Sequence, residues 1–102
     1  MIQVIAIIHA KPGMRSKILD FLHANVPKVR AEPGCVEYMA TVDASGAPGL
    51  QTPIGPDSFI VFERWADMPS FQAHADAPHV ITYRQNTAEF IASRPVHVLS
   101  AL

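Results

Sequence analysis

The chain has 102 residues, 49% of them apolar, and its nine acidic and eight basic side chains give a formal net charge of -1. This length predicts one domain over residues 1–102, with enough apolar residues to form a core. No basic run marks a surface for nucleic acid or an anionic membrane, and no apolar run is long enough to span a bilayer. Cys35 is the only cysteine, which excludes an intrachain disulfide, and we expect a soluble cytoplasmic protein.

The first 34 residues predict a strand followed by an amphipathic helix. Residues 2–10 are short, β-branched and nearly all apolar, and Lys11-Pro12-Gly13 ends the strand. From Met14, apolar residues recur every three or four positions, which is typical of a helix with one buried face. The helix must end near Glu32-Pro33-Gly34, because a residue before proline avoids the α region and glycine accepts a left-handed turn.

The middle of the chain predicts a second strand and a long loop. Residues 35–42 alternate, which places Val36, Tyr38, Ala40 and Val42 on one side of the strand. Residues 43–57 are rich in glycine and proline and are long for a connection between two strands. They form either a flexible excursion at the sheet edge or an arm that packs on a partner subunit or a pocket mouth, with Leu50 and Ile54 as its anchors.

The last 45 residues predict a strand, a broken helix and a final strand. Residues 58–65 include four consecutive apolar residues, so both faces of this strand need cover. Asp67 is a good N-cap, and Asp76-Ala77-Pro78 restarts the helix, which we expect to continue to Ser93-Arg94-Pro95. In that helix, Ile81, Arg84, Ala88 and Ile91 form one stripe. Residues 96–102 complete the chain as a fourth strand.

This order, β-α-β-β-α-β, predicts an α+β ferredoxin-like fold with helices on one side of a four-stranded antiparallel sheet. Helices can cover only one face of such a sheet, yet its strands carry apolar residues on both faces. Left open, the second face would be a large exposed apolar patch. We therefore expect a homodimer that forms through the sheet face.

Several short motifs occur in a characteristic order along nearly the whole chain. They are Lys11-Pro12-Gly13, the stretch from Arg30 to Cys35, the stretch from Phe62 to Asp67 that leads to Phe71 and His74, and Pro78-His79. With these motifs the sequence resembles the antibiotic biosynthesis monooxygenase (ABM) family of the dimeric α+β barrel superfamily. The resemblance implies that two copies form a dimeric barrel. Such proteins include cofactor-independent oxygenases of quinols and polyketide phenols, haem-degrading enzymes and an isomerase of a signalling sugar.

Cofactor-free oxygenation requires a base that titrates near neutrality, a donor for a developing oxyanion and a dry apolar pocket. The sequence has no G-x-G-x-x-G fingerprint and no phosphate loop, so we expect no flavin or nicotinamide cofactor. Its five histidines show no tight metal-ligand spacing, so we expect no metal site either. The haem-degrading branch uses an asparagine in the first strand, and residues 2–10 contain none.

The expected catalytic residues are His74 as the base, Trp65 as a flat wall for an aromatic ring, and Tyr83 or Arg84 as the oxyanion donor. Each has a structural alternative. His74 equally suits a core or helix-capping role, Trp65 an anchor in the core or interface, and Tyr83 and Arg84 an amphipathic rim.

Three further residues are expected to contact the substrate: His79 after the helix break, His9 at the end of the first strand, and Phe62 in the third. A capping role for His79 and a structural role for His9 are the alternatives. Glu63, in a strand covered on both faces, needs a partner, for which Arg64 of the other subunit or a backbone donor is available.

The sequence thus favours a cofactor-independent monooxygenase that uses dioxygen and a small quinol or polyphenolic aromatic. Two alternatives remain open at this point. One is a non-catalytic dimer that binds a small aromatic ligand, and the other is an isomerase of a small metabolite.

Overall fold

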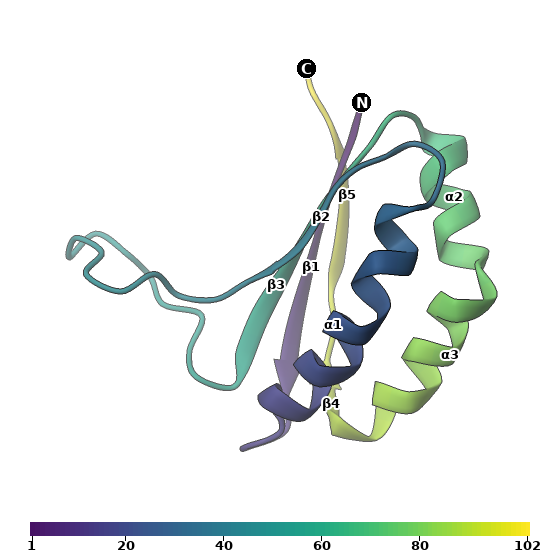
Figure 1. The fold of residues 1–102 in the computed structure, drawn as a ribbon. Helices are drawn as coiled ribbons and strands as arrows, with labels where there is room; N and C mark the ends of the chain where they lie inside the picture. The colour runs from purple at the N-terminus through teal and green to yellow at the C-terminus, as the bar shows by residue number, and fades with distance from the viewer.

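A computed structural model describes residues 1–102 as one antiparallel sheet with its helices on a single face (Figure 1). The elements are β1 (Ile2–Ala10), α1 (Arg15–Arg30), β2 (Cys35–Thr41), β3 (Ser58–Trp65), α2 (Met68–Asp76), α3 (Pro78–Thr87), the 3-10 turn η1 (Ala88–Phe90), β4 (Ile91–Ser93) and β5 (Val96–Ser100). The strands lie in the order β2-β3-β1, and both β4 and β5 pair with the free edge of β1. The predicted α+β fold is confirmed, with five strands in place of four.

The register of the central strand β1 determines which residues face the helices. Val4 lies opposite Glu63 in β3 and Val98 in β5, and Ala6 lies opposite Val61. Opposed residues in antiparallel strands point to the same face. Val4 and Ala6 are only 1% and 6% exposed, so this face is the one that packs against the helices.

Helix α1 covers the sheet with the apolar stripe that its sequence predicts. Ile18, Leu22, Val26 and Val29 are all buried in it. The second helical region breaks at Ala77, which is extended (φ -64, ψ 135), because it precedes Pro78. At the other end, the side chain of Asp67 accepts a hydrogen bond from the Ser70 N–H, which confirms the predicted N-cap.

The predicted end of the last helix is wrong. Helix α3 stops at Thr87, and Ile91, which we placed on a helical stripe, is extended (φ -102, ψ 127). The Lys11 N–H donates to the Phe90 carbonyl at 2.9 Å, and Ala10 pairs with Ile91. The unpaired edge of β1 therefore takes residues 91–93 as a strand in preference to two more helical turns.

The alternation predicted for β2 holds only in its centre. Tyr38 is buried and Ala40 is half-buried on the helix side. Val36 falls at a bulge between Cys35 and Glu37 and is 47% exposed, and Val42 lies beyond the end of the strand. A bulge adds an unpaired residue, which shifts the pattern by one position.

No helix covers the opposite side of the sheet, here called the outer face (Figure 1). Phe62 lies between Ile5 of β1 and Met39 of β2 in the register, and Ile60 lies beside Ile7. The apolar residues of the outer face are Ile5, Ile7, Met39, Ile60, Phe62 and Leu99.

The segment of residues 43–57 projects from one end of the sheet (Figure 1). The Asp43 carboxylate accepts hydrogen bonds from the N–H groups of Ile54 and Gly55, both at 2.9 Å, and so closes its base. Leu50 at its tip is 88% exposed, and Ile54 is half-buried. None of the three helices is long and apolar enough to cross a membrane.

Candidate active site

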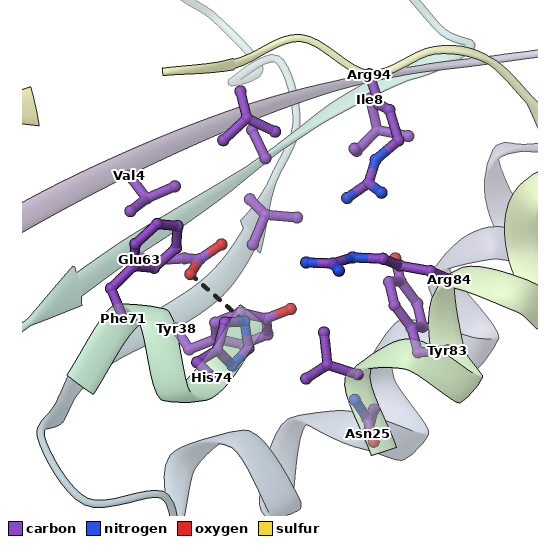
Figure 2. Close-up of a pocket in the computed structure, with 14 residues that line it drawn as sticks. Val4, Ile8, Asn25, Tyr38, Glu63, Phe71, His74, Tyr83, Arg84 and Arg94 are labelled. Atoms are coloured by element: carbon purple, nitrogen blue, oxygen red, sulfur yellow. Dashed lines mark ion pairs between the residues drawn. The ribbon is translucent and has the colours of Figure 1, made fainter. Parts of the chain in front are cut away.

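A small cavity of about 60 Å³ lies between the sheet and the helices (Figure 2). Apolar side chains of β1 and β3 form its floor, and polar side chains reach it from α1, α2, α3 and the link between β4 and β5. The lining residues are Val4, Ala6, Ile8, Asn25, Tyr38, Val61, Glu63, Phe71, His74, Val80, Tyr83, Arg84, Arg94 and Val96.

His74 is the central polar group of the cavity wall. It lies in the last turn of α2 and is only 5% exposed. Its Nδ1 atom is 2.8 Å from Oε2 of Glu32, which follows α1 directly after Ala31. An ionised carboxylate can only accept, so in the neutral imidazole Nδ1 carries the proton and Nε2 is the free acceptor.

Glu63 is a second carboxylate beside the same histidine. Its Oε1 lies 3.8 Å from Nε2 of His74, and the residue is 6% exposed. Burial raises the pKa of Glu63, while a hydrogen bond from Trp65 and the nearby His74 and Arg84 offset part of that rise. His74 thus sits between two carboxylates, those of Glu32 and Glu63.

The partner of Glu63 differs from the one we expected. The indole Nε1 of Trp65 donates to Oε1 of Glu63 at 2.9 Å. Successive strand residues point to opposite faces, so Arg64 lies on the outer face, where its Nη1 is 3.8 Å from Glu37.

Trp65 packs against the ring of His74 and does not line the cavity. Its side chain is fully buried, with a ring centroid 4.6 Å from that of His74. Tyr38 and Phe71, which do line the cavity, supply the aromatic walls. Alternation in β2 predicts that Tyr38 faces the helices. It does not predict which side chains Tyr38 meets in the cavity.

Tyr83 and Arg84 both line the cavity, as the oxyanion-donor hypothesis requires. Burial raises the pKa of Tyr83 to about 12, so its hydroxyl stays protonated and can donate a hydrogen bond. Nη1 of Arg84 donates to the carbonyl of Ala75 at 3.2 Å, which links α3 to the end of α2.

The three residues expected to contact substrate lie outside the cavity. His79 lines a groove between α1 and α3, with Nδ1 3.2 Å from Oδ1 of Asn25 and Nε2 3.6 Å from Glu32. His9 bonds through Nδ1 to the Ser58 hydroxyl at 2.8 Å, and Phe62 is part of the outer face. The structure therefore brings His74, Tyr83 and Arg84 together, but not His9 or Phe62.

Sequence reasoning missed Glu32 and Arg94 as members of the site. Glu32 stands in the Glu32-Pro33-Gly34 turn, which predicts a helix end but no contact with His74. Arg94 belonged to a predicted helix end, whereas the structure places it between β4 and β5 at the cavity. No three His, Cys, Asp or Glu side chains are grouped so that they could hold a metal ion.

A family comparison and a comparison with curated proteins both match this chain to monooxygenases. Residues 1–86 match the family described as antibiotic biosynthesis monooxygenase, ABM. The Escherichia coli K12 protein named "Probable quinol monooxygenase YgiN" is 31% identical over 101 residues, which cover 97% of this chain and 96% of that protein.

Solved structures share the fold over almost the full length. Rv0793 from Mycobacterium tuberculosis is 28% identical with a TM-score of 0.81, covering 99% of this chain and 94% of that one. PA3566 from Pseudomonas aeruginosa is 24% identical with a TM-score of 0.79, covering 99% and 93%. The chain therefore belongs to the antibiotic biosynthesis monooxygenase family, and this membership supports a role of the monooxygenase type.

Proposed function

We propose that this protein is a cofactor-independent monooxygenase that oxidises a small quinol or polyphenolic aromatic with dioxygen. The main support is the buried His74, which lines the cavity: its Nδ1 lies 2.8 Å from Glu32, while its Nε2 forms no hydrogen bond and lies 3.8 Å from Oε1 of Glu63. A base with this arrangement suits the removal of a phenolic proton. The name of the E. coli relative, a quinol monooxygenase, points to the same substrate class.

The proposed reaction begins when Nε2 of His74 accepts the proton of a ring hydroxyl. The ring anion passes one electron to dioxygen, and the ring radical and superoxide combine to form a carbon–oxygen bond and a hydroperoxide. Loss of water then breaks the O–O bond and the adjacent C–H bond. A quinol plus dioxygen gives a hydroxyquinone plus water, and the substrate supplies every electron, so no external reductant is needed.

Charge develops on the ring oxygens during this sequence, and two groups are available to stabilise it. The neutral Tyr83 hydroxyl and the Arg84 guanidinium both line the cavity. Donors that are already in place within a largely apolar site stabilise such charge at little reorganisation cost. The carboxyl groups of Glu32 and Glu63 lie 2.8 and 3.8 Å from the two ring nitrogens of His74.

The cavity, at about 60 Å³, is small beside typical ligand pockets of about 300–1,000 Å³. Movement of lining side chains would enlarge it for an aromatic ring. Arg94 is exposed and forms no hydrogen bond or ion pair, so its movement breaks no polar contact.

The proposal includes a homodimer formed through the outer face. Phe62 and Ile60 lie in the centre of that face, and Met39 and Leu99 are 39% and 46% exposed. A contiguous apolar patch on a sheet is typical of an interaction site. A second copy would cover the face that the helices leave open.

The test is oxygen uptake with a panel of anaerobically prepared benzo- and naphthohydroquinones. Wild type, His74→Ala and a no-enzyme control are compared, with Lys11→Gln as a control variant at an exposed turn that does not line the cavity. Saturable uptake that falls about 100-fold in His74→Ala, but not in Lys11→Gln, supports the proposal. Uptake equal to autoxidation in every sample would refute it. Uptake that survives in His74→Ala would retain the activity and exclude His74 as the base.

A further inference from the structure

Two arginines face the cavity without a carboxylate partner. Figure 2 shows the guanidinium groups of Arg84 and Arg94 pointing into the space, on the side opposite Glu63 and His74. The four ion pairs of the structure involve Arg64, His74 and His79 as the cationic partners, so neither cavity arginine is paired within 4.0 Å. Arg84 forms one hydrogen bond, to the Ala75 carbonyl, and Arg94 forms none.

The charge of Arg94 acts on both cavity tyrosines. Burial raises the pKa of Tyr38 and Tyr83, and the positive charge of Arg94 offsets part of both rises. Arg94, Tyr38 and Tyr83 all line the cavity, and the two tyrosines come from β2 and α3. Arg94 is not held by the hydrogen bond that fixes Arg84 to Ala75.

A quinol carries one negative charge after its proton moves to His74, and the Tyr83 hydroxyl is one donor available for it. The guanidinium of Arg94 has no counterpart in such a substrate. A carboxylate on the ring would supply the missing anion, because the two oxygens of a carboxylate match the planar fork of arginine.

We propose that Arg84 and Arg94 form an anion subsite, and that the substrate is an aromatic hydroxy acid, with its carboxylate at the arginines and its hydroxyl at His74. The placement of the reacting hydroxyl at His74 rests on the proposed function. The subsite itself is a binding property and is testable without turnover. Arg94 lies at the exposed rim, so the carboxylate points outward and the ring lies on the apolar floor of β1 and β3.

The first experiment measures binding by calorimetry in the absence of oxygen. The probes are 4-hydroxy-2-naphthoate and 1-naphthol, which differ by one carboxylate. We expect wild type to bind the acid about tenfold or more tightly than the phenol. Arg94→Gln and Arg84→Gln should lose most of that preference, Arg94→Lys should retain part of it, and Lys11→Gln, which also removes one positive charge, should leave it unchanged.

The second experiment separates this subsite from the proposed activity. Oxygen uptake is compared for 1,4-dihydroxy-2-naphthoate and naphthalene-1,4-diol, both of which keep a free ring carbon beside a hydroxyl. Preferential binding without any uptake would support the subsite and refute the monooxygenase. Uptake with equal kcat/KM for both diols would support the monooxygenase and refute the subsite. Equal binding of the two probes, no binding of either, or a preference that survives in Arg94→Gln would also overturn the subsite.

Discussion

The Nδ1 atom of His74 lies 2.8 Å from Oε2 of Glu32, and this contact joins the last turn of α2 to the turn after α1. It sets the tautomer of the imidazole and therefore which ring nitrogen faces the cavity as an acceptor. The same Glu32 oxygen lies 3.6 Å from Nε2 of His79. One carboxylate therefore contacts a histidine of α2, before the helix break, and a histidine of α3, after it.

Replacing Glu32 with glutamine should lower kcat by at least about tenfold while leaving the fold intact. A neutral amide presents either an oxygen or an N–H to Nδ1, so it neither fixes the tautomer nor stabilises the imidazolium. Steady-state oxygen uptake with the best hydroquinone measures the effect. Glu37→Gln is the matched control, because Glu37 lies on the outer face beside Arg64. An unchanged kcat in Glu32→Gln would show that this carboxylate does not act through His74.

The sequence predicted the order of elements better than the site. Periodicity and the Pro-Gly turns identify β1, α1 and β3, because these signals are local. The contact between Glu32 and His74 joins residues 42 positions apart, and no local pattern encodes it. The predicted end of α3 was wrong for a related reason, because Ile91 pairs with Ala10, which is far from it in the sequence. Helical periodicity does not reveal a competing strand edge.

Gly34→Ala should destabilise the protein more than Gly13→Ala. Both glycines have positive φ, 81° and 77°, so alanine costs each about 1–2 kcal/mol. A Cβ at Gly34 would also overlap the Ser70 hydroxyl in the first turn of α2, whereas a Cβ at Gly13 meets nothing within 4 Å. Urea unfolding should give a loss of about 3 kcal/mol for Gly34→Ala and about 1 for Gly13→Ala. Equal losses would show that Ser70 moves away freely.

Alkaline pH should destabilise the protein through its two tyrosines. Burial raises the pKa of Tyr83 to about 12 and also raises that of Tyr38, from an ordinary 10.0. The folded protein therefore favours the neutral hydroxyls, and this contribution is full below pH 10 and lost as the pH rises towards 12. Urea unfolding from pH 8 to 11.5 measures the slope, which Tyr83→Phe should reduce. Tyrosinate absorbance that appears near pH 10 in folded protein would contradict this prediction.

Glu63→Gln should stabilise the protein at neutral pH while it lowers activity. Burial raises the pKa of Glu63 above 4.5, so the folded state favours the protonated acid. Stability from this group is full below pH 4.5 and declines as the pH rises through the folded pKa. Glutamine keeps an acceptor for the Trp65 indole and removes the buried charge. Unfolding free energies of the variant should fall less steeply above pH 4.5 than those of wild type, and a parallel slope would refute this assignment.

A charge at the centre of the outer face should dissociate the proposed dimer. Phe62 lies between Ile5 and Met39 in the register, so glutamate there would be buried without a partner when two sheets pack together. We expect Phe62→Glu to raise the dissociation constant of the dimer about 100-fold or more, as measured by analytical ultracentrifugation across a concentration series. Ile81→Glu is the matched control, because Ile81 is 42% exposed on α3, on the helical side of the sheet. If wild type sediments as a monomer at every concentration, or if Ile81→Glu dissociates the dimer and Phe62→Glu does not, the outer face is not the interface. Dissociation by Phe62→Glu alone would establish that the second copy supplies the cover that the helices do not.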